Sequence, residues 1–157
     1  MSYQNIYKLT IVNSNMRHPQ EIEVWYIMPA IRKELCNILL DKNNFNQKET
    51  AKLLNITEAA VSQYKKEKRG QHVKLPESVL AEINISAKKI VNDESTVFRE
   101  TQNILNHIRD TSTICDIHKM LDDSIESNCT ECILHLKINK KVEVSPSIDK
   151  KNVENYS

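Results

Sequence analysis

The chain has 157 residues, a formal net charge of +1 and 39% hydrophobic residues, which suffice for one domain or for a small domain with an appendage. A single glycine disfavours folds rich in tight hairpins, such as β-sandwiches, and favours helices. No run approaches the roughly 18 apolar residues of a membrane span, and no basic-then-apolar leader is present, so we expect a cytoplasmic protein without a membrane partner.

The first forty residues predict an arm followed by a helix. Residues 1–20 show no clear period and are expected to form a loosely held N-terminal arm. The apolar run in residues 21–28 predicts a short strand or an extended lead-in. Pro29 suits the first position of a helix, because its missing N–H donor costs nothing there, and apolar spacings of three and four extend that helix to about Leu40.

Residues 41–66 predict a turn and two short helices. The turn is polar, and Asn46 is expected to cap a helix over Gln47–Leu54. Asn55 should break that helix and Thr57 should cap the next one. This third helix is expected to run through Lys66 toward Gly70, the single glycine, which could end it in a left-handed conformation.

The second predicted helix and the third meet at Ala51, whose small side chain permits two helices to cross steeply. Val61 and Tyr64 should then face inward. The start of the third helix carries Glu58, Ala59, Ser62 and Gln63, a set that suits the tip of a recognition helix in the major groove of DNA. Alanine can approach a thymine methyl group, and Gln63 can form a bidentate pair with adenine.

Positive charge accompanies this pair of helices. Between residues 47 and 74 there are seven Lys or Arg against three Glu, an excess that suits contact with phosphates. Gln47 is a further candidate for phosphate contact, from its place at the start of the second helix. The candidate DNA-binding residues are Gln47, Lys48, Lys52, Thr57, Glu58, Ala59, Ser62, Gln63, Lys65, Lys66, Lys68 and Arg69.

The segment QKETAKLLNITEAAVSQYKK resembles the helix-turn-helix of phage-repressor and Cro-like regulators. Residues 20–75, with the lead VWYIMPAIRKEL and the exit KRG, are more specifically similar to archaeal transcriptional regulators. The resemblance implies that this region binds operator DNA as a dimer. The chain departs from the pattern at Asn55, where glycine is usual, and at Thr50, where an apolar residue is more common.

A cluster of cysteine and histidine lies near the C-terminal end. Cys115, His118, Cys129 and Cys132 form C-x2-H, ten intervening residues and C-x2-C, a spacing that can converge on one ion. Tetrahedral Zn²⁺ in a structural site is the simplest occupant. An iron–sulfur cluster, which would make the protein a redox or oxygen sensor, and a metal-free segment are the alternatives.

Other histidines and cysteines of the chain are weaker candidates for metal binding or catalysis. His107 and His135 could replace His118 but are read as surface residues, and Cys36 is expected to be a buried thiol on the first helix. An enzyme is disfavoured, because four ligands close the site and position 120, where zinc deaminases carry a glutamate, is Met.

The sequence therefore predicts a mainly α fold and a dimeric, sequence-specific regulator that binds double-stranded DNA. The alternative is a metal-stabilised protein-interaction adaptor without specific DNA binding. The predicted order is an N-terminal arm (1–20), a helix-turn-helix domain (21–75), a helical dimerisation or linker region (76–112), a Cys/His metal-binding segment (113–136) and a flexible tail (137–157).

Overall fold

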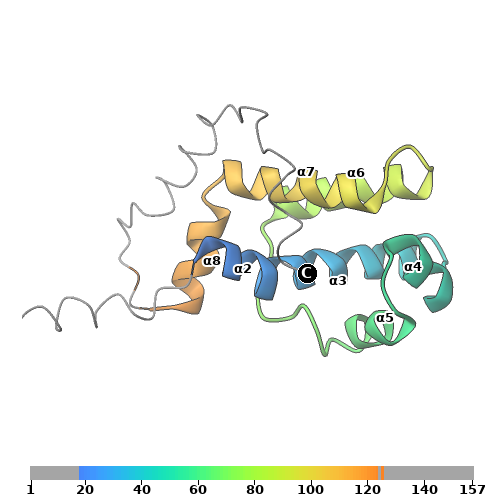
Figure 1. Cartoon of the computed structure of the whole chain (residues 1–157), viewed down its shortest axis with the longest axis horizontal. Coiled ribbons are helices and arrows are strands. Elements are labelled where there is room, and N and C mark those ends of the chain that lie inside the picture. The colour runs from blue at the N-terminus through green and yellow to red at the C-terminus, as the bar shows by residue number, and fades with distance from the viewer. Residues whose placement is uncertain (1–17, 124, 126–157) are drawn as a thin grey trace, which may run out of the picture.

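The computed structural model describes residues 18–123 and residue 125. Helices hold 73% of these residues and no strand occurs among them, which confirms the prediction of a mainly α protein. One long helix crosses the molecule, with a pair of short helices packed near its C-terminal end and a helical hairpin along its side (Figure 1). The elements are α2 (Pro19–Ile22), η1 (Glu23–Ile27), α3 (Met28–Asn37), η2 (Ile38–Lys42), α4 (Gln47–Leu54), α5 (Glu58–Lys65), α6 (Glu77–Val91), α7 (Val97–Asp110) and α8 (Thr113–Leu121).

The first four elements join into a continuous helix over residues 19–42, in which η1 and η2 are π-helical turns. The expected strand or extended lead-in over residues 21–28 is therefore wrong, and the arm does not reach residue 20, because the helix begins at Pro19. The His18 N–H donates to Glu21 Oε2 at 2.7 Å and satisfies one backbone donor at this end.

Pro29 lies inside the long helix rather than at its start. A proline in a helix lacks one N–H donor and its ring crowds the preceding turn. Here the preceding turn is π-helical, and the Met28 N–H bonds to the Glu23 carbonyl five residues back. The wider turn gives space for the ring directly before Pro29, so the helix continues.

The short helices α4 and α5 begin and break where the sequence predicts. The Glu49 N–H donates to Asn46 Oδ1 at 2.9 Å and the Asn46 N–H donates to Glu49 Oε2 at 2.8 Å, a reciprocal pair at the start of α4. Asn55 takes a left-handed conformation (φ 54°), and the Ala60 N–H donates to Thr57 Oγ1 at 3.1 Å at the start of α5. These local bonds confirm all three predicted helix boundaries.

The end of α5 differs from the prediction. The helix ends at Lys65, and the left-handed residue that follows it is Glu67 (φ 54°) rather than Gly70. The Glu67 N–H still bonds to the Tyr64 carbonyl at 3.0 Å, which closes the last turn. Gly70 also has a positive φ, of 73°, but it lies beyond the helix and has another structural role.

The hairpin of α6 and α7 joins the same core as the N-terminal helices. Val79, Ile83, Ala87 and Ile90, spaced by three and four residues, are buried, and α6 packs on both α3 and α7. Cys36, on the inner side of α3, is completely buried, as predicted. The buried apolar side chains from residue 22 to residue 117 form one cluster.

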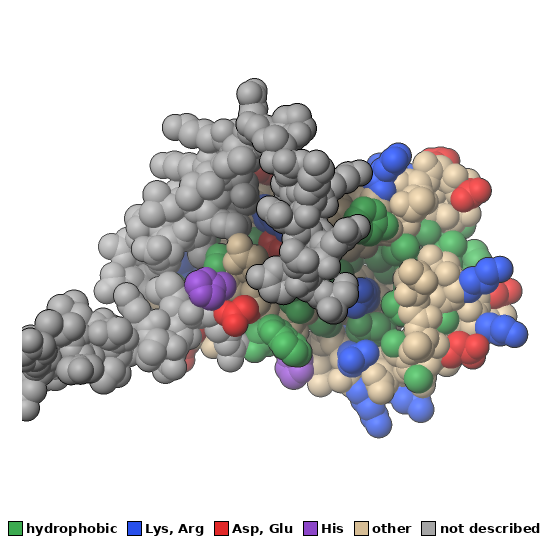
Figure 2. Space-filling model, in the orientation of Figure 1, with side chains coloured by type: hydrophobic (Ala, Val, Ile, Leu, Met, Phe, Trp, Pro, Cys, Tyr) green, Lys and Arg blue, Asp and Glu red, His purple; other side chains and the backbone are tan. Residues whose placement is uncertain are grey.

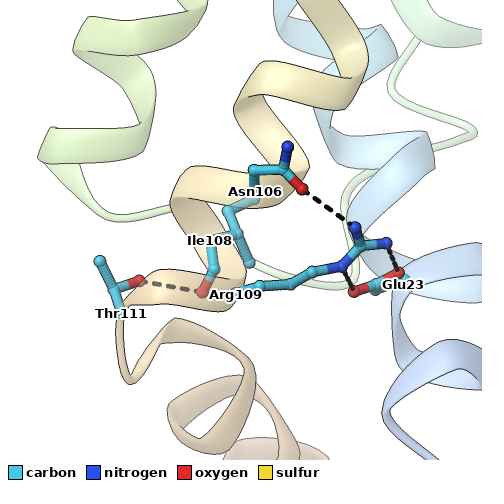
Figure 3. A network of polar contacts seen from close by, with 5 residues as sticks. All are labelled: Glu23, Asn106, Ile108, Arg109 and Thr111. Atoms are coloured by element: carbon cyan, nitrogen blue, oxygen red, sulfur yellow. Dashed lines mark hydrogen bonds and ion pairs between the residues drawn. The ribbon is translucent and has the colours of Figure 1, made fainter. Parts of the chain in front are cut away.

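Two buried carboxylates have partners from other helices. The Arg109 guanidinium, on α7, donates from Nε to Glu23 Oε1 and from Nη2 to Glu23 Oε2, each at 2.7 Å (Figure 3). The bond to Glu23 raises the pKa of Arg109 and outweighs the opposing effect of desolvation. This bidentate pair ties the start of the long helix to the end of α7.

The second carboxylate, Glu100 on α7, is only 2% exposed and accepts a bond from the Ser86 hydroxyl of α6 at 2.8 Å. Burial raises the pKa of Glu100, but the side chains of Ser95, Ser86 and Lys89 lower it to below its ordinary value. The charged carboxylate therefore links the two helices of the hairpin.

Among the described residues, no helix has the length and apolar character needed to cross a membrane.

Candidate nucleic-acid interface

One face of α5 is built into the core. Val61 is completely buried and Tyr64 is 3% exposed, as the sequence predicts for the inward-facing side. Ala51 of α4 is also buried, and its carbonyl accepts the N–H of Ile56, in the turn between the two helices, at 3.0 Å. The inner face thus fixes the orientation of α5 relative to α4 and to α3.

The opposite face of α5 is open. Glu58, Ala59 and Gln63 are exposed, and Ser62 is half-buried. Three of these four predicted contact residues thus present their side chains to solvent and the fourth does so in part. This face of α5 is therefore accessible to solvent along most of its length.

The candidate residues before and at the start of α5 differ in how exposed they are and in whether they already form hydrogen bonds. Thr57 is exposed, but its hydroxyl oxygen already accepts the Ala60 N–H, so its contribution at this end of α5 includes the cap itself. Gln47, the first residue of α4, is half-buried, whereas Lys48 beside it is exposed. Thr50, one of the two departures from the repressor-like pattern, is completely buried, and its Oγ1 has no hydrogen-bond partner among the described residues.

Cationic side chains surround this face. Figure 2 shows several of them gathered over α5 and over the segment that follows it. All of the predicted cations are exposed: Lys48, Lys52, Lys65, Lys66, Lys68 and Arg69. Lys74, which the sequence counts in the charge balance but not among the contact residues, is exposed as well.

Two of the three acidic side chains of this region, Glu49 and Glu67, have local partners. Glu49 is engaged by the Asn46 N–H, and Glu67 forms an ion pair with Lys33 of α3, Nζ to Oε1, at 3.1 Å. Sequence reasoning missed Lys33, because no local pattern signals a partner 34 residues away. Glu58 stays exposed in the first turn of α5, where the helix dipole favours a carboxylate.

The predicted metal ligands are described only in part. Cys115 is half-buried and His118 is buried, and both belong to α8, three residues apart and so on one side of the helix. Cys129 and Cys132, with the alternative ligand His135, lie outside the described residues. Within the described part of the chain, no group of three or more potential ligands gathers around one point.

No protein-family model, curated protein or solved structure matches this chain.

Proposed function

We propose that the chain is a sequence-specific DNA-binding transcriptional regulator, in which α4 and α5 form a helix-turn-helix and α5 is the recognition helix. The observation that carries the proposal is the division of α5 into two faces. Val61 and Tyr64 are buried, while Ala59 and Gln63 are exposed beside a rim of cations. A buried face fixes the helix and an open face with short side chains permits close approach to base edges.

Each group of residues has a distinct role in this proposal. Gln63 pairs with a base edge, Ala59 packs on a base, and Ser62 adds a short polar contact. The lysines, together with Arg69, contact phosphates, which fix the register of the protein on the duplex but carry no sequence information.

Selection from a randomised duplex library followed by fluorescence anisotropy tests this assignment. We expect the full chain to prefer the selected duplex over a scrambled one of equal length, and Gln63→Ala to reduce that preference by about 1–3 kcal/mol at one base position. Gln102→Ala, an exposed glutamine on α7, is the matched control and should leave the preference unchanged. Equal binding of selected and scrambled duplexes by the wild type would contradict the proposal.

We also propose a dimer on the operator, since two-fold protein symmetry matches a palindromic site with half-sites one helical turn apart. Light scattering with and without duplex measures the stoichiometry. A monomer bound to a single half-site would contradict this part of the proposal.

The Cys115, His118, Cys129 and Cys132 set is proposed as a metal site, with zinc as the structural occupant or an iron–sulfur cluster as the sensory one. Metal analysis and the visible spectrum of protein purified without oxygen distinguish the two. Colourless protein with one zinc per chain supports zinc, a brown protein supports the cluster, and absence of both overturns the site.

A further inference from the structure

The segment after α5, residues 66–75, has no helix or strand, yet it follows one face of the long helix. Three contacts define its course: Glu67 with Lys33, Gly70 with the Pro29 backbone, and His72 with Tyr26, whose rings meet edge to face at 6.4 Å between centroids. The partners on the helix are spaced by three and four residues, so they share one face. Their order is the reverse of the segment's order, which means that the segment runs antiparallel to the helix (Figure 1).

Gly70 lies against the backbone of Pro29, with no space for a side chain. It is buried, and a Cβ atom at this position would lie 2.4 Å from the Pro29 carbonyl oxygen and 2.9 Å from Lys33 Cβ. Its φ of 73° is also one that other residues adopt with strain. The single glycine of the chain is thus required where two backbones touch, rather than at the end of a helix.

Buried side chains hold the rest of the segment. Val73 is 7% exposed and Leu75 is 5% exposed, so the second half of the segment is anchored in the core. Lys74, between them, points away from the core and is exposed. We call residues 66–75 the basic strap, because it carries four exposed cations: Lys66, Lys68, Arg69 and Lys74.

Charge and dimensions suit a polyanion. The one carboxylate of the basic strap, on Glu67, is paired with Lys33, so the four cations have no acid within the strap to neutralise them. From Tyr26 to Lys33 the helix rises roughly 10 Å, at about 1.5 Å per residue. A duplex presents about six phosphate charges over that length, at one charge per roughly 1.7 Å.

We propose that the basic strap is a second phosphate-binding element, and that Gly70, through its contact with Pro29, is the positioning residue that holds it beside α5. The inference depends on the proposed DNA-binding function and extends it. Recognition by α5 supplies selectivity, while the strap grips the sugar–phosphate backbone next to the groove that α5 enters. Because the strap follows a rigid helix, its cations keep a fixed distance from Gln63.

The salt dependence of binding to a random-sequence 20-base-pair duplex tests the strap, since each phosphate contact contributes about 0.9 to the slope of log K against log salt. We expect Arg69→Gln with Lys74→Gln to lower the slope by about 1.8. Between 50 and 200 mM salt, the wild type should therefore lose about 12-fold more affinity than this double variant. The control is Lys88→Gln with Arg99→Gln, which removes the same charges from exposed positions on α6 and α7 and should keep the wild-type slope.

The outcomes separate the strap from the proposed function. A wild-type protein that binds no duplex at 50 mM salt overturns both. A wild type that binds, with equal slopes in the strap variant and its control, overturns the strap and the phosphate contact of Arg69, but leaves base recognition by α5 untouched.

Gly70→Ala tests the positioning role without a change of charge. The added methyl group must displace the strap from Pro29, and we expect a slope at least 1 lower than that of the wild type, with helical circular dichroism retained. A variant that melts at a lower temperature but keeps the wild-type slope would overturn the positioning role. If Gly70→Ala does not fold, the charge variants still decide whether the strap binds phosphate.

Discussion

The replacement of Arg109 by Met should destabilise the fold more than the replacement of any other partly exposed side chain on α7. Arg109 donates to both carboxylate oxygens of Glu23 and, from Nη1, to Asn106 Oδ1 at 3.2 Å (Figure 3). The Glu23 side chain is 9% exposed. Without the guanidinium, this carboxylate would remain buried with no cation beside it.

The magnitude follows from the burial of the two partners. Loss of one partner from a fully buried pair costs about 3–5 kcal/mol. The Arg109 side chain is 29% exposed, so water already screens part of the attraction, and we expect about 2 kcal/mol for Arg109→Met. For a domain of this size, that loss lowers the melting temperature by roughly 5–10 °C.

Urea unfolding followed by circular dichroism measures these values in a double-mutant cycle with Glu23→Met. The double variant should lose less than the sum of the single variants, by about 1–2 kcal/mol, because it leaves no unpaired charge. Arg99→Met, an exposed arginine on the same helix, is the control and should stay within about 0.5 kcal/mol of the wild type. Additive losses, or a loss below about 0.5 kcal/mol for Arg109→Met, would refute the assigned role of the pair.

Three further changes test other parts of the fold. Glu100→Gln should lower the free energy of unfolding, measured with urea, by about 1–2 kcal/mol at pH 7. Folding lowers the pKa of Glu100, so its charged carboxylate stabilises the fold above the ordinary pKa of 4.5. The difference in free energy of unfolding between wild type and variant should therefore close as the pH falls below that value. Asn46→Ala should cost about 1 kcal/mol in the same assay, and an unchanged stability would show that the bonds at the start of α4 contribute nothing. Burial raises the pKa of Cys36 to about 12, so peptide mapping after iodoacetamide treatment at pH 7 should find this thiol unlabelled in folded protein and labelled in urea, and rapid labelling of folded protein would contradict its burial.

The predictions that the structure confirms depend on local chemistry. Asn46, Asn55 and Thr57 act through bonds or dihedral angles within four residues of themselves, so the local sequence is enough to place both ends of α4 and the start of α5. The inward positions of Val61 and Tyr64 follow from helical period alone.

The predictions that failed depend on neighbours distant in the chain. The apolar run of residues 21–28 suits a strand as well as a helix, and its helical form brings Glu23 to Arg109, 86 residues away. The prediction that Gly70 ends a helix invokes local geometry alone, whereas Gly70 contacts the distant backbone of Pro29. The same limit applies to Lys33, whose ion pair with Glu67 no nearby residue indicates.

The π-helical turn η1 holds one residue more than an α-helical turn would need at the same place. In a purely α-helical segment an extra residue would rotate everything before it by about 100° around the helix axis, since an α-helix has 3.6 residues per turn. The wider turn takes up this residue with far less rotation, so α2 stays on α8 and Glu23 stays beside Arg109. A single-codon deletion within Glu23–Ile27 should therefore be felt first at Pro29, whose ring would meet a narrower preceding turn.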